Sequence, residues 1–237
     1  MMRDSNPDEV TLNKESLADQ IFEVVRKRII DLDILPGEKI DVEALADEFD
    51  VSKAPVRDAM KALAGRGLIS IEPRVGYYAR ELDAGDVQDI YDMRELFEVY
   101  ALGEVIDKVP EDLIEQCRQD SLKIKENNLR GKERRQWFDQ TDEMLHQEII
   151  LGHSKNVFLK DFTTRIHDLI SLTRHLNKRI SQAIEEHLDI LTALKQRDKA
   201  KAEQSLEYHL KRVRQETLRA IEDDFNADYG LQRGGGN

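Results

Sequence analysis

The chain has 237 residues, of which 40% are hydrophobic and 35% charged, and its formal net charge is −12. This length is enough for two modest domains that each bury a core, and no apolar run approaches the roughly 18 residues of a membrane span. The first residues lack the apolar core of a signal peptide, and the single cysteine, Cys117, excludes an intrachain disulfide and a cysteine-based zinc cluster. We therefore expect a cytoplasmic protein without membrane association. An acidic chain repels nucleic acid unless it carries a local basic surface.

The first eighty residues predict three helices followed by a hairpin. Apolar residues recur at helical spacing in SLADQIFEVVRKRIID, residues 16–31, with Ser16 as the expected N-cap. The segment LPGEKI interrupts the helical pattern, and Asp41 can cap a short second helix, VEALADEF. After a tight turn, Ser52 can cap a third helix over about 53–64, which the glycines of GRG end. Two β-rich runs, LISIE and GYYARE, then predict a hairpin around PRVG.

These elements together predict a winged helix-turn-helix, in which the third helix enters the major groove of DNA. Residues 51–80 carry six basic and two acidic residues, a local balance of +4 in an acidic chain. Ser52, Lys53, Arg57 and Lys61 lie on or near the exposed start of the third helix, where basic charge supplies the phosphate attraction that dominates affinity. We expect the acidic second helix to point away from this surface. A solvated helix face is the alternative interpretation of the charges. The face of the third helix predicted to pack in the core carries Val56, Met60 and Leu63.

The motifs PGEKI, EALADEF and VSKAPVRDAMKALAGRGLI, followed by a glycine-containing wing, resemble the GntR family of bacterial transcription regulators over about residues 16–80. The resemblance implies DNA contacts from Lys39, Ser52, Lys53, Ala54, Pro55, Arg57, Arg74 and Gly76. Lys39 and Lys53 stand where the family usually has arginine, and lysine cannot form the bidentate contact to guanine that arginine forms. We therefore expect Arg57 to be the main determinant of base specificity.

From Asp86 onward the sequence predicts helices alone. Their ranges are 86–107, 112–129, 132–152, 155–177, 180–196 and 199–225. About six helices with short connections predict an antiparallel all-α bundle, so the predicted fold is mainly α. The expected domain boundaries are 14–80 for the winged helix-turn-helix, 81–85 for a linker, 86–225 for the helical domain and 226–237 for a disordered tail.

All six histidines of the chain lie in the helical half. Asp142 and His146 are four residues apart and share one face of a helix, and His187 and His209 lie on successive helices that fold back on each other. One carboxylate and three imidazoles from three helices could converge on a divalent ion such as zinc or nickel, which favours N and O ligands. Sequence alone does not show convergence, so surface or core histidines are the alternative interpretation.

The DxxxH pattern and the later segment QAIEEHLDILTALKQRDKAKAEQSLEYHL resemble the FCD effector-binding domain of the FadR branch of the GntR family. Six helices without a clear seventh are similar to its shorter, VanR-like version. The resemblance implies that Asp142, His146, His187 and His209 bind a divalent ion, with zinc expected and nickel or manganese as alternatives. It also matches Arg94 to an arginine that can hold an effector carboxylate. A structural ion pair is the alternative role for Arg94.

These resemblances imply a ligand-responsive transcription regulator, with repression as the expected logic, that binds palindromic operator DNA as a homodimer. A small organic acid would bind at the metal site and oppose DNA binding. Three alternatives stay open: a metal-dependent hydrolase, a regulator whose metal is structural or is itself the signal, and an architectural DNA-binding protein without an effector. An enzyme is not expected, because no further residue is clearly placed as a general acid or base.

Overall fold

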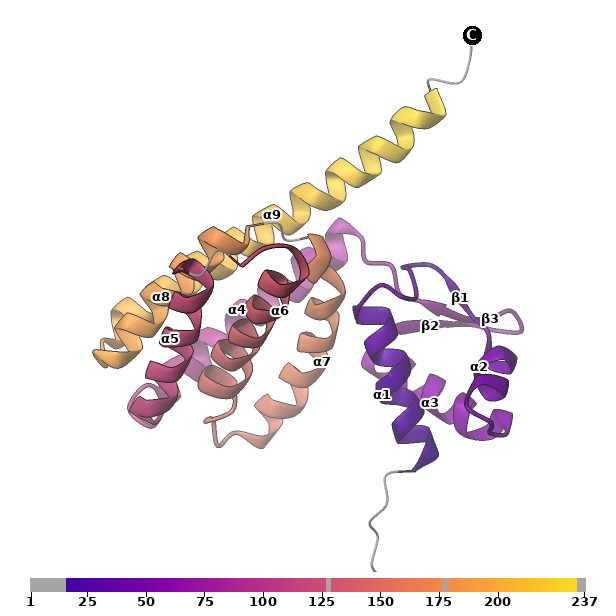
Figure 1. Ribbon diagram of the computed structural model, residues 1–237, viewed down its shortest axis with the longest axis horizontal. Helices are drawn as coiled ribbons and strands as arrows, with labels where there is room; N and C mark the ends of the chain where they lie inside the picture. The colour runs from indigo at the N-terminus through magenta and orange to yellow at the C-terminus, as the bar shows by residue number, and fades with distance from the viewer. Residues whose placement is uncertain (1–15, 127–128, 177–178, 234–237) are drawn as a thin grey trace, which may run out of the picture. The chain divides into compact units, whose positions relative to one another are not determined.

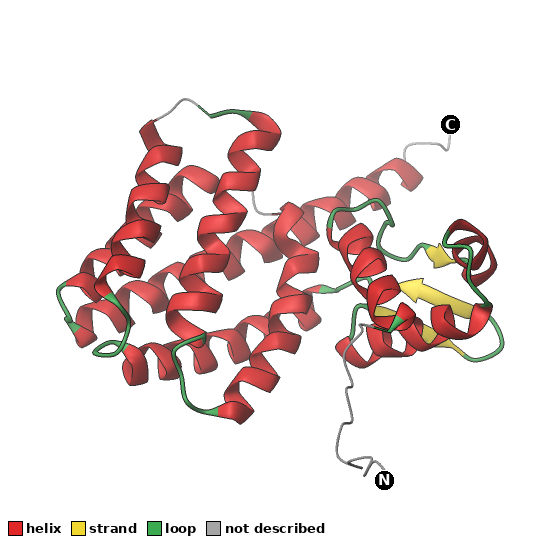
Figure 2. Ribbon diagram, turned by 60° about the horizontal axis from the view of Figure 1, so that its bottom comes forward, coloured by secondary structure: helices red, strands yellow, loops and turns green. Residues whose placement is uncertain are grey.

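The computed structural model describes the backbone of residues 16–126, 129–176 and 179–233, and the side chains up to residue 223. The chain divides into two compact units, Met1–Glu81 and Leu82–Asn237. Within the described ranges, strands occur only in the first unit (Figure 2), so the fold is mainly helical as predicted. None of the helices in this part of the chain is long and apolar enough to cross a membrane.

Three helices of the first unit are α1 (Leu17–Ile30), α2 (Val42–Glu48) and α3 (Lys53–Arg66), labelled in Figure 1. A capping box begins α1, because the Ser16 hydroxyl accepts from the amide of Asp19 and the Asp19 carboxylate accepts from the amide of Ser16. Asp41 accepts from the first amides of α2, as predicted. Ser52 occupies the N-cap position of α3 but makes no capping hydrogen bond, so this predicted cap is wrong. Its hydroxyl is exposed, and water can replace the missing partner at little cost.

The core of the first unit forms where α3 packs on α1. Val56, Met60 and Leu63 of α3 are fully buried, as predicted. Their buried counterparts on α1 are Ile21, Val25 and Ile29. The helix α3 ends at Gly67, whose φ of 82° is the left-handed conformation that terminates helices. Gly65 lies inside α3 and does not end it.

A three-stranded antiparallel sheet completes the first unit, with β1 (Lys39–Ile40), β2 (Ile69–Glu72) and β3 (Gly76–Ala79) in the order β1-β3-β2. The strands β2 and β3 form the predicted hairpin, with Ile69 opposite Ala79. β1 was not predicted, because a two-residue strand carries no readable alternation. It pairs with β3, with Lys39 opposite Tyr78, and so joins the segment before α2 to the wing.

The second unit consists of α4 (Ala84–Val105), α5 (Glu111–Glu126), α6 (Gly131–Glu143), the π-helical η1 (Met144–Leu151), α7 (Val157–Thr173), the 3₁₀ turn η2 (Arg174–Leu176), α8 (Ile180–Lys195) and α9 (Lys199–Arg233). Each predicted helix is present, and η1 continues the helix begun by α6. α4 starts two residues earlier than expected, because the Asp83 carboxylate accepts from the amide of Asp86.

The end of the chain differs from the expectation of a disordered tail over 226–237. α9 continues to Arg233, so residues 226–233 are helical. The segment FNADYGLQR contains a single glycine and no proline, and the glycine run that disfavours helix begins only at residue 234. Residues 234–237 lie outside the described part of the chain.

The main core of the second unit lies between α4, α5, η1, α8 and α9. Fully buried aliphatic residues from these elements include Leu102, Ile114, Ile149, Leu191 and Leu206. A second apolar cluster joins α4 to α7. This packing fixes the facing sides of η1, α8 and α9, which carry the three histidines considered next.

Candidate metal centre and nucleic-acid interface

The predicted DNA-contacting residues of α3 lie at its N-terminal end. Ser52, Lys53, Ala54 and Arg57 are exposed, and Pro55 is partly buried. Arg57 forms no ion pair with any of the residues that the structure describes. Its guanidinium is therefore available for the bidentate contact to a guanine edge that arginine makes in the major groove.

Lys53 differs from Arg57, because its ammonium group forms an ion pair with Glu43 of α2. The expectation that the acidic second helix points away from the basic surface is thus wrong for Glu43. The short turn between α2 and α3 brings the two side chains within reach of each other. A DNA phosphate would have to compete with this carboxylate for Lys53, so the ion pair would lower what Lys53 could contribute to phosphate binding.

The wing residues lie beside β1. Arg74 is exposed in the turn between β2 and β3, with a φ of 67°. Gly76 has a φ of 151°, and a Cβ at this position would lie 3.0 Å from Cε of Lys39. The absence of a side chain at Gly76 makes room for the Lys39 side chain. Lys39, Arg74 and Gly76 therefore belong to one local surface.

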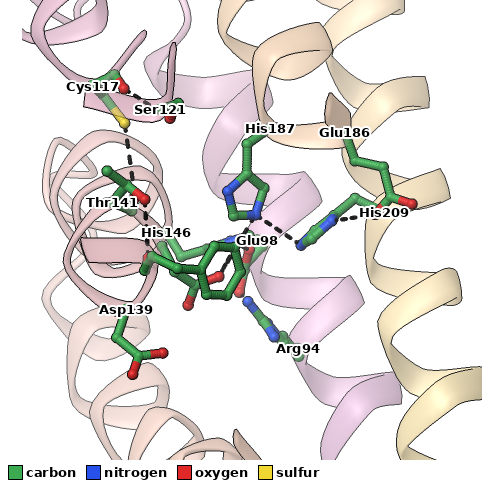
Figure 3. Close-up of polar contacts among 12 residues, drawn as sticks. Arg94, Glu98, Cys117, Ser121, Asp139, Thr141, His146, Glu186, His187 and His209 are labelled. Carbon is green, nitrogen blue, oxygen red and sulfur yellow. Dashed lines mark hydrogen bonds and ion pairs between the residues drawn. The ribbon is translucent and has the colours of Figure 1, made fainter. Parts of the chain in front are cut away.

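The four predicted metal ligands converge inside the second unit. Figure 3 shows the three histidines of this cluster, together with Glu98 and Glu186. Asp142 lies on α6, His146 on η1, His187 on α8 and His209 on α9. Each residue offers one ligand atom, and these atoms all lie within 4.8 Å of one another. The three imidazoles are 1–2% exposed, whereas the Asp142 side chain is 20% exposed. The cluster is buried on the histidine side and is reached from solvent on the side of Asp142.

The spacing of these atoms fits a divalent ion. Nε2 of His187 lies 3.3 Å from Nε2 of His209 and 3.6 Å from Oδ1 of Asp142, which is 3.7 Å from Nε2 of His146. Zinc bonds of about 2.0–2.1 Å place tetrahedral ligand atoms about 3.3–3.4 Å apart. Nε2 of His146 is also buried without a hydrogen-bond partner. Such an orphaned acceptor is costly in a protein interior unless a ligand satisfies it, so the residues present fit a metal ion.

Two carboxylates that the sequence did not indicate, Glu98 and Glu186, orient two of the imidazoles through their Nδ1 atoms. Nδ1 of His146 lies 2.5 Å from Oε2 of Glu98, and Nδ1 of His209 lies 2.9 Å from Oε2 of Glu186. Each Nδ1–H can donate to its carboxylate, which leaves the Nε2 lone pair directed at the centre of the cluster. Glu186 could have been found, because it directly precedes His187 in the EEH motif. Glu98 lies 48 residues from His146, so no local pattern indicates it.

The electrostatics of the cluster favour neutral side chains at His187 and His209 and ionised carboxylates at Asp142 and Glu98. Burial, and after it the charge of a neighbouring imidazole, holds the pKa of His187 and of His209 well below 6.5. Burial alone would raise the pKa of both Asp142 and Glu98. His146 and His187 nevertheless hold the pKa of Asp142 below its usual value, and Arg94, followed by His146, lowers the pKa of Glu98 to about 2. At neutral pH the cluster therefore presents lone pairs on His187 and His209 and a negative charge on Asp142.

Arg94, the predicted effector-binding residue, lies next to the cluster but is already paired. Its Nε donates to Oε1 of Glu98 at 2.7 Å, and the side chains of the pair are 6% and 3% exposed. Tyr91 covers the guanidinium, with its ring centroid 5.8 Å from Cζ. This is the alternative role of Arg94, a structural ion pair, and it connects Arg94 to His146 through the shared carboxylate.

A small cavity borders the cluster on the side of Asp142 and His209. Its volume of about 30 Å³ is room for about one water molecule. The other charged residues that line it are Arg94, Arg135, Asp139 and Arg174, and the apolar ones include Tyr91, Phe138, Ile170 and Val213.

Each of the two units matches a known protein family. Residues 17–78 match the family described as bacterial regulatory proteins, gntR family, and residues 89–212 match the FCD domain. The HTH-type transcriptional regulator YdhC of Bacillus subtilis (strain 168) is 30% identical over 197 residues, which cover 80% of this chain and 86% of that protein. The HTH-type transcriptional repressor RspR of Escherichia coli (strain K12) is 26% identical over 216 residues, 89% of this chain and 92% of the relative.

Solved structures agree with this assignment. McbR/YncC of E. coli is similar with a TM-score of 0.71 over 89% of this chain and 99% of that chain, and its 18% identity supports the fold alone. The Zn²⁺-bound FCD domain of TM0439 is 26% identical, with a TM-score of 0.52 over 60% of this chain and 97% of that chain. The relatives are transcription regulators, so the chain is a regulator and not an enzyme. The chain belongs to the GntR family of bacterial transcription regulators, in the FadR-like branch that combines an N-terminal helix-turn-helix with a C-terminal FCD domain.

Proposed function

We propose that this regulator is a dimeric, metal-dependent repressor whose affinity for a palindromic operator is lowered by a small organic acid. The observation that carries the proposal is the buried convergence of Asp142, His146, His187 and His209, with Nε2 of His146 lacking a partner. A related FCD domain binds Zn²⁺, and the relatives include repressors. One of these, the gluconate operon transcriptional repressor of B. subtilis, is named after a carboxylic acid.

The residues around the cluster can connect effector binding to the DNA-binding unit. A divalent ion held by the four ligands would supply Lewis-acid attraction for a carboxylate. Glu98, which bonds His146, lies on α4, and α4 begins at Ala84, shortly after the end of the first unit at Glu81. A shift of His146 on effector binding is therefore passed through Glu98 to the helix that leads to the winged unit. Such coupling typically changes affinity about 5–150-fold.

The proposed dimer is supported by an exposed apolar patch on α4 and α7. Leu96 and Tyr100 on α4 are 62% and 57% exposed, and Phe158 and Phe162 on α7 are 72% and 61% exposed. Phe162 stacks on Phe97 of α4 at 6.3 Å between ring centroids, so α7 packs beside the part of α4 that carries Leu96. The three exposed aromatic side chains alone leave about 400 Å² uncovered, at about 150–250 Å² each. This is about half of what one partner contributes to a stable interface, and a palindromic operator makes a second copy of the chain the matching occupant.

A second candidate is a regulator in which the metal is itself the signal. The cavity beside the cluster holds only about one water molecule, which favours this candidate if the surrounding side chains do not move. The two candidates differ in their response to organic acids, because only the first predicts that an acid changes the DNA affinity of zinc-loaded protein.

The test starts from an operator selected from random DNA by the wild-type protein. Fluorescence anisotropy then measures the operator Kd of wild type, His187→Gln and the control His153→Gln, with and without zinc and a series of small carboxylates. We expect a carboxylate to weaken binding by wild type and His153→Gln but not by His187→Gln. A response to zinc without a response to any acid selects the second candidate, and no response to either contradicts both.

A further inference from the structure

We propose that Arg174, and not Arg94, holds the effector, and that the effector carries two acidic groups. The inference rests on the proposed function, because it concerns an acid bound beside the metal cluster. It follows from which of the arginines that line the cavity already have partners, and from the charge that remains on the cavity lining after these ion pairs are set aside.

Arg94 is poorly suited to bind a ligand. Its guanidinium is buried against Glu98, which in turn receives Nδ1–H of His146. Turning Arg94 toward a ligand would leave the Glu98 carboxylate buried without its main counter-ion, which proteins avoid. Arg94 therefore serves as a positioning residue for the Glu98–His146 pair.

Arg174 is in a different state. It lies at η2, immediately after α7 ends, and lines the cavity together with Asp142 and His209. Its Nε is buried without a hydrogen-bond partner. Among the described residues, its only side-chain hydrogen bond runs from Nη2 to Nε2 of His167 at a long 3.4 Å, and it forms no ion pair. Its charge also acts on Asp142, because it helps to lower the pKa of that carboxyl.

A guanidinium with unsatisfied donors at a cavity wall matches a carboxylate. Arginine presents planar N–H groups that bind both oxygens of a carboxylate at once, which fixes its orientation as well as its charge. The ligand oxygens would replace the long contact to His167 and satisfy the buried Nε. Arg174 therefore supplies one acid-binding position, separate from the position at the metal cluster.

The charge around the cavity indicates a second acidic group. Two of the arginines that line the cavity are neutralised in ion pairs, Arg94 by Glu98 and Arg135 by Asp139. Arg174 and Asp142 remain, and their charges are equal and opposite. Metal-ligating imidazoles are neutral, so a divalent ion leaves two positive charges in excess. Buried charge is costly unless it is matched, and a dianion matches both charges where a monoanion matches one.

The present cavity of about 30 Å³ is too small for such an acid. The cavity wall can rearrange, because the Arg174 side chain is only partly buried. The backbone carbonyl of Arg174 accepts a hydrogen bond from Nη2 of Arg135 at 2.7 Å, so the two residues are linked. A ligand that draws in the Arg174 side chain would thereby also shift Arg135 on α6, the helix that carries Asp142. The length of acid that fits depends on this movement, so a series of lengths is needed to test the proposal.

The test is calorimetric titration of zinc-loaded, full-length protein with malonate, succinate and glutarate, and with propionate, butyrate and valerate as monoacids of matched chain length. Proteins are wild type, Arg174→Gln and the surface control Arg118→Gln. We expect at least one diacid to bind wild type and Arg118→Gln about tenfold or more tighter than its matched monoacid, the usual scale for a charged hydrogen bond. Arg174→Gln should lose this difference while it retains zinc.

The inference is overturned if wild type binds monoacids as tightly as diacids, if it binds none of the diacids, or if Arg174→Gln keeps the preference. Zinc content separates this failure from failure of the proposed function, because wild type that cannot be loaded with zinc contradicts the metal site itself. If Arg174→Gln does not fold, Arg174→Lys keeps the charge without the planar donor pair, and we expect it to reduce the preference for diacids.

Discussion

The metal-free protein should lose stability as the pH falls below about 6.5, the usual pKa of histidine. In the folded protein the pKa of His187 and of His209 is well below 6.5, because both imidazoles are buried next to other cationic groups. Below about pH 6.5 the unfolded chain therefore binds more protons than the folded chain, and the free energy of unfolding decreases as the pH is lowered. Above this pH, His187 and His209 are neutral in both the folded and the unfolded state, and their contribution to the free energy of unfolding is fully present.

The expected slope follows from the two groups. Each imidazole that protonates only on unfolding changes the free energy of unfolding by about 1.4 kcal/mol per pH unit, so the pair gives up to about 2.7 kcal/mol per pH unit. Glu98 acts in a lower window. Its pKa of about 2 in the fold is below the usual value of 4.5, so its contribution is present above 4.5 and is lost as the pH falls towards 2.

Urea unfolding of chelator-treated protein between pH 7.5 and 5.5 measures this slope. The single tryptophan, Trp137, packs in the second unit against the apolar cluster of Ile124, Phe138, Ala183 and Ile184, so its fluorescence reports on the unit that holds the metal ligands. The variant His209→Gln should lose about half of the slope, whereas His153→Gln, outside the cluster, should keep all of it. A free energy of unfolding that is constant over this pH range would refute the assignment of two buried neutral imidazoles.

Other predictions concern the outer carboxylates, the DNA surface and the dimer. Glu186→Gln should weaken zinc binding about 10–100-fold in a competition titration with a chromogenic chelator, and unchanged affinity would remove Glu186 from the site. Arg57→Ala should abolish the preference for the selected operator over random DNA in anisotropy titrations, and retained discrimination would show that another residue reads the bases. The double change Leu96→Glu and Phe158→Glu should yield monomers by light scattering, whereas Leu35→Glu, at a well-exposed leucine of the first unit, should stay dimeric. If the double variant is still dimeric, the dimer interface lies on another surface.

Periodic features of the sequence predicted most of the fold. The apolar face of α3, with Val56, Met60 and Leu63, was readable because helical spacing repeats over several turns. The strand β1 was not readable, because two residues are too few for a pattern. The pairing of Lys53 with Glu43 was missed because net charge along the chain does not say which side chains meet across a turn.

The sequence likewise indicated some residues of the candidate site and not others. The converging aspartate and histidines were indicated by spacing and by resemblance to a family, although their role as ligands stays a prediction. Glu98 and Arg174 were missed, because each reaches the cluster from a helix distant in sequence and neither belongs to a motif. Arg94 was noticed for its family position, but only the contact with Glu98 shows that its charge is already matched.

The metal site is tested most directly by the metal content of the protein as purified and after incubation with zinc, measured by elemental analysis for wild type, His187→Ala and His153→Ala. We expect about one ion per chain in wild type and in His153→Ala, and loss of the ion in His187→Ala, because removing one of the four ligands weakens metal binding. Metal in none of the proteins, or equal metal in all three, would contradict a metal site built from Asp142, His146, His187 and His209.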